Sequence, residues 1–135
     1  MSSLGIIALS GAKMIDKYRA NIRLAYSIRK LSSTYTGNTI RVRESSGNAE
    51  ADIGFDSSGN LDEDALLTHC GDNDGFIAKW YDQSGNGGNL EQTTTTNQPQ
   101  IVSSGVVLKE NGKPIITGLA ASNGSHLDLS GTKST

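Results

Sequence analysis

The spacing of hydrophobic residues along the chain predicts mainly short β-strands. Residues 39–43 alternate branched apolar residues with arginines, as a strand with one buried face does, and residues 51–55 repeat the alternation. The turn-forming residues 45–48 between them predict a hairpin. Residues 76–81 are apolar on both faces apart from Lys79, which predicts a strand in the centre of a sheet. Further short strands are expected at 99–103, 106–109 and 114–119, separated by Gly105 and Asn111-Gly112.

Two segments carry the spacing of an amphipathic helix. The first begins at Asp16, a candidate N-cap, and runs to Leu31. Tyr18, Ile22, Ala25, Tyr26 and Arg29 share one face of this helix, and Leu24, Ile28 and Leu31 widen its apolar stripe. The second is a short helix over 61–70, with Asn60 as its candidate cap and Gly71 at its end. The residues of this short helix expected to face inward are Leu61, Ala65 and Leu66.

Size and composition limit the chain to a single hydrophobic core. Its 135 residues, 35% hydrophobic with sixteen glycines, favour turns over helices. We expect an apolar amino-terminal arm at 1–15 and a β-sandwich domain at 16–135. The formal net charge of −2, from 12 basic and 14 acidic residues, predicts no nucleic-acid or membrane partner. Cys70 is the only cysteine, which excludes an internal disulfide and a zinc site built of thiolates.

The apolar part of the arm is Leu4 to Leu9. No basic segment precedes it, it is too short to span a bilayer, and no small-x-small cleavage site follows it. The sequence therefore predicts a protein that stays in the cytoplasm, or leaves the cell by assembly into a particle or by lysis. The arm is expected to pack against a neighbouring subunit, with packing against its own domain as the alternative.

The most informative stretch is residues 80–89, where an aromatic strand runs into a turn rich in polar side chains and glycine. Aromatic faces beside amide and carboxylate groups suit a sugar, because a ring face packs on a pyranose while the polar groups take its hydroxyls. The candidate carbohydrate-binding residues are Trp80, Tyr81, Asp82, Gln83 and Asn86. The alternative is a tight turn that closes a buried strand, with Asp82 and Ser84 bonding their own backbone.

Metal binding and catalysis find little support in the residues. Asp82, Ser84 and Asn86 match the first positions of a calcium loop, but Thr93 stands where the closing glutamate belongs, so we expect no metal and no cofactor. The carboxylates weighed for glycoside hydrolysis form no recognisable pair; they are Asp52, Asp56, Asp82, Glu91 and Asp128. His69, His126 and Cys70 lack the neighbours of a catalytic base or nucleophile. No catalytic residue is predicted.

A succession of short motifs resembles a known family. In order they are Ala25-Tyr26-Ser27-Ile28-Arg29-Lys30-Leu31, Tyr35-Thr36-Gly37, Ile40-Arg41-Val42-Arg43, Asp52-Ile53-Gly54-Phe55, Trp80-Tyr81-Asp82-Gln83-Ser84-Gly85-Asn86-Gly87, Asn97-Gln98-Pro99 and Asn111-Gly112-Lys113-Pro114. The succession, from about Tyr18 to Leu129, resembles the amino-terminal half of a concanavalin A-like jelly-roll domain. It is similar to the catalytic domain of fungal α-L-arabinofuranosidase B and to phage and prophage structural proteins.

The resemblance implies a mainly β fold, a partial concanavalin A-like jelly-roll sandwich with an amino-terminal helix and one short helix. It also implies a bacteriophage virion structural protein, a fibre, tail or capsid-surface module that binds host surface polysaccharide, assembled in the host cytoplasm and located in the virion. Other virion subunits, in a homo-oligomer, are the expected partners. The alternatives are a pure assembly protein that completes its sheets with neighbouring subunits, and a fragment of an arabinofuranosidase-like glycoside hydrolase.

Departures from the family pattern limit the enzyme alternative. The second cysteine that follows the match to Cys70 in arabinofuranosidases is missing, because Gly75 and Phe76 occupy that region. The family's nucleophile and acid lie in the carboxy-terminal half of its domain, which this chain does not contain. The resemblance therefore carries no catalytic residue across to this sequence.

Overall fold

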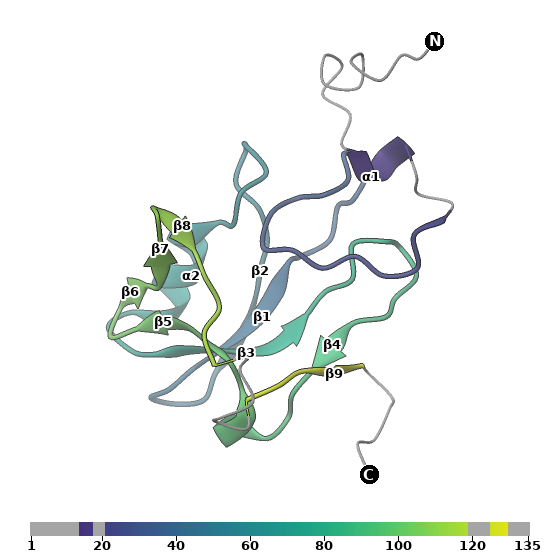
Figure 1. The fold of residues 1–135 in the computed structure, drawn as a ribbon. Helices are drawn as coiled ribbons and strands as arrows, with labels where there is room; N and C mark the ends of the chain where they lie inside the picture. The colour runs from purple at the N-terminus through teal and green to yellow at the C-terminus, as the bar shows by residue number, and fades with distance from the viewer. Residues whose placement is uncertain (1–13, 18–20, 119–124, 130–135) are drawn as a thin grey trace.

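The computed structural model describes residues 14–17, 21–118 and 125–129. They form a mainly β protein with a seven-stranded and a two-stranded antiparallel sheet, which confirms the predicted fold class (Figure 1). The specific jelly-roll topology stays a prediction. In chain order the elements are α1 (Met14–Lys17), β1 (Ile40–Glu44), β2 (Glu50–Ile53), α2 (Glu63–Cys70), β3 (Gly75–Trp80), β4 (Leu90–Glu91), η3 (Thr95–Asn97), β5 (Gln100–Ser103), β6 (Val106–Val107), β7 (Lys109–Glu110), β8 (Lys113–Pro114) and β9 (Asp128–Leu129).

The hairpin predicted from the alternating residues is present. β1 pairs antiparallel with β2, and the buried residues Ile40 and Ile53 lie opposite each other. Glu44, at the end of β1, closes the turn by accepting hydrogen bonds from backbone N–H groups of the turn. These donors are Ser46, Gly47 and Ala49. The polar turn thus fixes the register that places one face of the hairpin in the core.

Strand β3 is the centre of the seven-stranded sheet, as its two-sided apolar sequence predicts. One edge pairs with β1, where the register shifts between Arg41 and Val42 and leaves Ala78 as an extra residue. The other edge is shared: the start of β3 pairs with β5, and its end pairs with β4. β9 extends the sheet beyond β4, and β6 extends it beyond β5. Trp80 therefore ends a strand that has partners on both edges.

The late strands are shorter than predicted and form two separate hairpins, β5–β6 in the seven-stranded sheet and β7–β8 in a sheet of its own, so the predicted continuous β meander is wrong. The segment expected at 106–109 is divided between β6 and β7. A strand is expected over 114–119, but β8 is Lys113–Pro114 and shares only Pro114 with that range. The turn between β7 and β8 matches the sequence, since Asn111 and Gly112 both have positive φ angles, of 52° and 76°. Two consecutive positive φ angles are what a two-residue hairpin turn requires.

Helix α2 begins two residues later than the start predicted at Leu61. Its N-cap is Asp62 and not the predicted Asn60. The Asp62 carboxylate accepts a hydrogen bond from Ala65 N–H at 3.0 Å. Gly71 ends the helix as predicted, with a φ of 57°. Leu61 and Leu66 are buried, but Ala65 is exposed, so the prediction that Ala65 faces inward is wrong. Leu61 lies before the helix, so the four-residue spacing from Leu61 to Ala65 is not a helical one. The buried face of the helix carries Leu66 and Cys70 instead.

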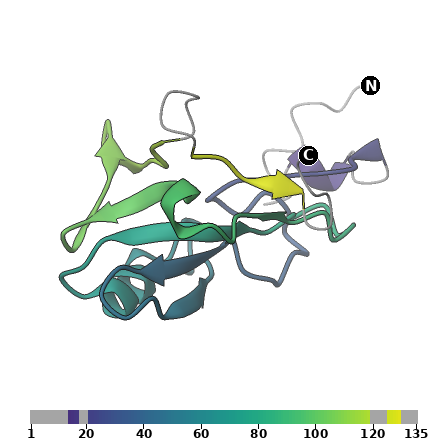
Figure 2. The ribbon, with the colours of Figure 1, turned by 90° about the horizontal axis from the view of Figure 1, so that it is seen from below.

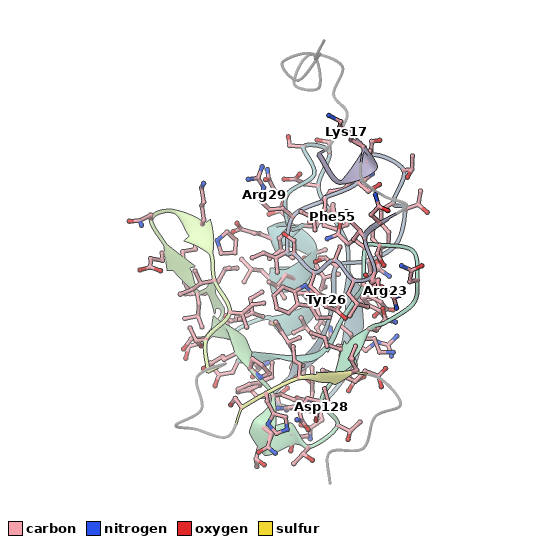
Figure 3. All side chains as sticks on the ribbon, turned by 45° about the vertical axis from the view of Figure 1, so that its right-hand side comes forward. Lys17, Arg23, Tyr26, Arg29, Phe55 and Asp128 are labelled. Carbon is pink, nitrogen blue, oxygen red and sulfur yellow. The ribbon has the colours of Figure 1, made fainter. Side chains whose placement is uncertain are left out.

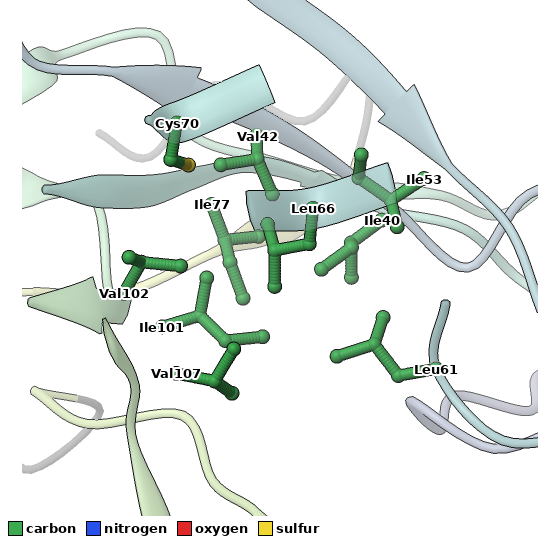
Figure 4. Close-up of a cluster of buried hydrophobic side chains, with 10 residues drawn as sticks. All are labelled: Ile40, Val42, Ile53, Leu61, Leu66, Cys70, Ile77, Ile101, Val102 and Val107. Carbon is green, nitrogen blue, oxygen red and sulfur yellow. The ribbon is translucent and has the colours of Figure 1, made fainter. Parts of the chain in front are cut away.

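The hydrophobic core lies between α2 and the strands it contacts (Figure 4). Figure 2 shows α2 on one side of the strands, against β1. Ten buried side chains form the core: Ile40, Val42, Ile53, Leu61, Leu66, Cys70, Ile77, Ile101, Val102 and Val107. They come from α2, its preceding turn and strands β1, β2, β3, β5 and β6, so burial of apolar surface joins this whole region.

The amino-terminal helix predicted from Asp16 to Leu31 is wrong over residues 22–31. Met14–Lys17 is helical, residues 18–20 lie outside the described residues, and residues 22–31 form an irregular segment without helix that we call the strap. The reason is that distant side chains take the backbone groups a helix would bond internally. For example, Gln83 Oε1 accepts a hydrogen bond from Leu31 N–H at 2.8 Å. Periodicity favoured a helix, but tertiary hydrogen bonds decide the conformation.

Two expectations concern the amino-terminal residues, of which 1–13 lie outside the described part. The apolar segment Leu4 to Leu9 lies outside the described residues, so its packing against a neighbour stays a prediction. The division into an arm at 1–15 and a domain at 16–135 also stays a prediction. Among the helices of the described part, none is long and apolar enough to cross a membrane.

Candidate functional site

The stretch predicted to hold a ligand, residues 80–89, is a loop that leaves the end of β3, and we call it the signature loop. Gly85 and Gly87 have positive φ angles, of 90° and 76°, so both provide the left-handed backbone expected of them. Gly88 has a different role, because a Cβ there would collide with Leu24 Cδ2. The loop therefore lies close against the strap.

Asp82 is the centre of a buried hydrogen-bond network. Its side chain is only 4% exposed, and its two oxygens accept bonds from Ala25 N–H at 2.8 Å, Ser84 N–H at 2.9 Å and Gly88 N–H at 3.1 Å. The Ser84 hydroxyl donates to the same carboxylate at 2.7 Å. Burial alone would raise the pKa of Asp82, but these hydrogen bonds outweigh it and lower the pKa. Asp82 is therefore an ionised acceptor that joins the signature loop to the strap.

Gln83 uses every hydrogen-bonding group of its side-chain amide on the strap. Its Oε1 accepts from Leu31 N–H at 2.8 Å, while its Nε2 donates to the carbonyls of Ser27 at 2.9 Å and Arg29 at 2.8 Å. The side chain is 1% exposed. An amide offers two donors and one acceptor on one planar group, and the strap presents two carbonyls and one N–H in return. No polar atom of Gln83 remains for a ligand.

Three more contacts complete the attachment of the strap. Asn86 Nδ2 donates to the carbonyls of Ile22 at 3.1 Å and Arg23 at 2.9 Å, and the Tyr26 hydroxyl donates to the Gly88 carbonyl. The Tyr26 ring also lies 6.2 Å from the Trp80 ring. In Figure 3, Tyr26 lies in the middle of the molecule, whereas Arg23 and Arg29 lie toward its outside. Tyr26 is thus half-buried, whereas Arg23 and Arg29 are exposed.

The five residues predicted to bind carbohydrate are together on this loop, but most of their polar groups are engaged. Trp80 and Tyr81 are partly buried, Trp80 packs against the core, and its Nε1 is buried with no hydrogen-bond partner among the described residues. Asp82 and Gln83 are buried, and Asn86 is exposed with its amide bonded to the strap. The alternative of a structural turn accounts for these contacts. Sugar contact by these residues stays a prediction.

On the other side of the strap lies a cavity of about 650 Å³. Three segments surround it: the strap, the loop that leads into α2, and the β7–β8 hairpin. Its lining residues are Ser27, Ile28, Arg29, Asp56, Asn60, Leu61, Asp62, Glu63, Asp64, Gly112, Lys113 and Pro114. Hydroxyl, amide, carboxylate and cationic groups therefore stand beside a few apolar side chains, the composition of a site for a small polar molecule.

Polar contacts hold each wall of the cavity. Lys30 N–H donates to the Gly59 carbonyl at 2.8 Å, which ties the strap to the loop before α2. In that loop Asp56 accepts the N–H groups of its own turn, and these bonds lower the pKa of its carboxyl. Glu63 forms an ion pair with Lys109 at 2.7 Å, which ties α2 to the hairpin. The cavity is thus framed by residues from three distant parts of the sequence.

A row of charged side chains crosses the solvent-facing side of the sheet. Arg41 on β1 makes two hydrogen bonds to Asp52 on β2, at 2.8 and 3.0 Å, and Tyr81 donates to the same carboxylate at 2.7 Å. Lys79 on β3 pairs with Glu91 on β4 at 2.5 Å. Burial and the Asp52 hydrogen bond raise the pKa of Tyr81 to about 12. The row satisfies its own charges, and two carboxylates weighed for catalysis, Asp52 and Glu91, belong to it.

The remaining candidates have structural surroundings. His69 Nε2 lies 3.0 Å from the Val42 carbonyl and 3.1 Å from that of Ala49, so its ring joins α2 to the first hairpin. His126 lies 3.3 Å from Asp128 at the surface. Cys70 is buried in the core, and burial raises the pKa of its thiol to about 11, which makes it a poor nucleophile.

The described residues contain no cluster of three or more histidines, cysteines or carboxylates that could hold a metal ion. The calcium-like spacing of Asp82, Ser84 and Asn86 is instead part of the network that anchors the strap. Sequence reasoning missed the cavity, because its walls come from separate segments with no shared motif. The many polar side chains of the signature loop predicted that it binds a partner. In the structure they bind the backbone of the strap.

Comparisons with known proteins agree with this fold. Residues 20–124 match the family described as α-L-arabinofuranosidase B, catalytic. A solved GH54 α-L-arabinofuranosidase soaked with a cyclic sulfate inhibitor is 27% identical with a TM-score of 0.52, over 58% of this chain and 19% of that chain. A glutamate-to-glutamine variant of a GH54 α-L-arabinofuranosidase, soaked with 4-nitrophenyl α-L-arabinofuranoside, matches with the same values.

The extent of these matches decides what they establish. A comparison with curated proteins gives no match. The chain spans 19% of the length of the solved arabinofuranosidases above, so their activity as whole proteins does not transfer by itself. The family match, however, extends over most of this sequence, from residue 20 to residue 124. The chain therefore belongs to the family of α-L-arabinofuranosidase B catalytic domains.

Proposed function

We propose that this chain is the non-catalytic part of an arabinofuranosidase-like β domain, and that it binds carbohydrate bearing arabinofuranosyl groups in the cavity beside the strap. The observation that carries the proposal is the cavity of about 650 Å³, lined by both polar and apolar groups, in a chain of this family. A furanosyl group is small and carries several hydroxyls. It would find amide and carboxylate acceptors at Asn60 and Asp62, and apolar surface at Ile28.

Hydrolysis by this chain alone is not part of the proposal. Glycoside hydrolysis needs a carboxylic acid with a raised pKa opposite a second carboxylate. In the described residues, each carboxyl group with a clearly altered pKa has it lowered, because hydrogen bonds stabilise the ionised form. These groups are Glu44, Asp52, Asp56 and Asp82. All four act as acceptors, and none is suited to donate a proton to a leaving group.

Calorimetric titration with an arabinofuranosyl-substituted xylo-oligosaccharide tests the proposal. The unsubstituted xylo-oligosaccharide is the ligand control, and release of 4-nitrophenol from 4-nitrophenyl α-L-arabinofuranoside measures turnover. We expect binding of the substituted sugar and no turnover. Equal binding of both sugars, or no binding of either, would contradict the assignment of the ligand. Sustained turnover by the purified chain would contradict the non-catalytic role.

A matched pair of variants places the site. Asn60→Trp puts a large side chain into the cavity mouth from an exposed lining residue, and Thr93→Trp adds the same side chain at an exposed position outside the cavity lining. We expect Asn60→Trp to weaken sugar binding about tenfold or more, equivalent to about 1.4 kcal/mol, and Thr93→Trp to leave it unchanged. Equal effects of the two variants would exclude the cavity as the site.

The virion role is a second proposal, and one structural feature favours it. β2 is an edge strand that pairs only with β1 among the described strands, so its outer edge offers backbone groups to a neighbouring subunit. In this proposal other virion subunits are partners and a host surface polysaccharide is the target. Light scattering tests it: a chain that folds only as an oligomer supports assembly, and a folded monomer at micromolar concentration contradicts it.

A further inference from the structure

The strap contacts both the signature loop and the cavity, and no residue of the signature loop lines the cavity. On one side Gln83 binds its backbone, and on the other side residues 27–29 line the cavity. Gln83 does not line the cavity and is 1% exposed. Any effect of Gln83 on a ligand in the cavity must therefore pass through the backbone of the strap.

The direction of the backbone groups shows how this transmission works. The carbonyls of Ser27 and Arg29 and the N–H of Leu31 all turn toward Gln83. The N–H of Lys30 turns the other way and donates to Gly59, in the loop that forms the opposite wall of the cavity. The chain bends at residues 28 and 29, among the groups that Gln83 binds. The strap thus has hydrogen bonds both to the signature loop and to the loop that leads into α2.

We propose that Gln83 is a positioning residue that sets the shape of the cavity wall formed by Ser27, Ile28 and Arg29, and so determines which sugar fits. This inference rests on the proposed function of the cavity. Few side chains could replace the amide. A glutamate offers only acceptors when ionised and would face two carbonyl oxygens, whereas a shorter asparagine could not span the same distance. Because Gln83 is 1% exposed, the backbone groups it leaves are shielded from bulk solvent.

A second contact fixes the same point of the wall. The Thr39 hydroxyl donates to the Ser27 carbonyl at 2.7 Å, and Thr39 is fully buried immediately before β1. The Ser27 carbonyl therefore receives hydrogen bonds from both Gln83 and Thr39. Removing either donor should loosen the same residue, by different amounts. This provides an independent variant should a change at Gln83 prevent folding.

The experiment compares Gln83→Glu with Gln92→Glu. Gln92 is also buried, at 7% exposed, and its amide also bonds backbone, donating to the His126 carbonyl and accepting from Thr94 N–H. It does not line the cavity. Both variants place a carboxyl group in a buried amide site, so a general loss of stability is matched between them.

Amide hydrogen exchange gives the readout that is independent of sugar. In Gln83→Glu at pH 7 the carboxylate can still accept from Leu31 N–H, so the readout is Lys30 N–H, which bonds Gly59 across the cavity wall. We expect its protection to fall about tenfold relative to Gln92→Glu, with the central strand β3 equally protected in both. Thr39→Val should give a smaller loss confined to the same segment. A loss spread evenly over sheet and strap, or unchanged Lys30 protection, overturns the positioning role.

Sugar affinity and its pH dependence give the second readout. At pH 7, Gln83→Glu should bind the arabinofuranosyl oligosaccharide about tenfold more weakly than Gln92→Glu. At pH 5 binding should partly recover, because a buried carboxyl beside two carbonyls has a raised pKa and, once protonated, donates one hydrogen bond again. Gln92→Glu, whose carboxyl lies in a buried site away from the cavity, should show no such recovery of affinity. Affinity equal to that of Gln92→Glu at both pH values overturns the inference.

Failure of the proposed function has a different signature. If the wild-type chain binds no sugar while exchange still increases only in the strap of Gln83→Glu, the assignment of the cavity to carbohydrate is wrong and the positioning of its wall is supported. If the wild-type chain binds sugar and exchange in the strap is unchanged by the variant, the positioning role is wrong and the proposed function stands.

Discussion

The region around α2 and the region around the strap are held together by different forces. The first is a cluster of ten buried apolar side chains joined by regular strand pairing. The second has little regular structure and depends on side chains of the signature loop that bond the backbone of residues 22–31. An apolar core keeps most of its stability when a substitution preserves volume and polarity. A buried polar network loses much of its stabilising energy when one hydrogen-bond partner is removed. The two regions should therefore respond differently to matched substitutions.

The largest effect is expected in the apolar region. Leu66→Ala removes a fully buried side chain from α2, and we expect the free energy of unfolding to fall by about 3 kcal/mol. Urea denaturation followed by circular dichroism measures it. Leu67→Ala, at a partly buried position of the same helix, is the control and should cost less. If the two variants lose equal stability, the division between core and periphery drawn here is wrong.

The next effect separates the polar region from the apolar one. Asp82→Asn keeps the shape of the side chain but removes an ionised acceptor of several buried bonds, and it should cost about 2 kcal/mol. Asp56→Asn, which alters similar bonds in an exposed turn, should cost less. Limited proteolysis should cut within residues 22–31 of Asp82→Asn before any other site, and cleavage first in the α2 region would contradict the comparison.

Lowering the pH should show how much the ionised Asp82 carboxylate contributes to stability. The native pKa of Asp82 is lowered, so its contribution is complete above the pKa of an unfolded aspartate, about 3.9, and is lost as the pH falls through the native value. Stability measured from pH 6 to pH 2 should therefore decline less steeply in Asp82→Asn than in the wild type. Identical slopes would mean that Asp82 carries no such linkage.

A moderate effect tests how closely loop and strap approach. Gly88→Ala introduces a Cβ that meets Leu24 Cδ2, the far end of a side chain that is 43% exposed and can turn away, so we expect a loss below about 1 kcal/mol. Leu24→Ala in the same chain should recover part of the loss, because it removes the obstructing methyl groups. A double-mutant cycle by thermal denaturation measures the coupling. Additive losses would show that the two residues do not meet.

The smallest effect is expected on the charged row across the sheet. Tyr81→Phe removes one hydrogen bond to a carboxylate that Arg41 already binds, so we expect a loss of about 0.5 kcal/mol. Because the native pKa of Tyr81 is raised from 10.0 to about 12, its contribution is complete below the pKa of an unfolded tyrosine and is lost as the pH rises through the native value. Ultraviolet titration should show a phenol with a high pKa in the wild type that is missing in the variant.

The comparison also explains which parts of the molecule the sequence could predict. Alternation at 39–43 and 51–55 and the two-sided apolar run at 76–81 predicted β1, β2 and the central position of β3, because core burial imposes those periods directly. The helix predicted from Asp16 to Leu31 failed where side chains more than fifty residues away take the backbone groups. Periodicity carries no information about such distant partners.

The candidate site follows the same rule. The signature loop was identified by its composition, and its glycines at positions 85 and 87 adopt the backbone predicted for them. Its role in holding the strap, and the cavity on the far side of the strap, depend on three-dimensional proximity between segments without a common motif.

The separation between the strap and its anchors also has a consequence for folding order. Ribosomal synthesis delivers residues 22–31 long before residues 82–86, whose side chains fix them. Contacts between distant residues form slowly because closing a long loop costs entropy. We therefore expect a nascent chain in which this segment stays undocked until β3 and its loop have emerged, and a native protein in which the same segment is the first to detach on heating.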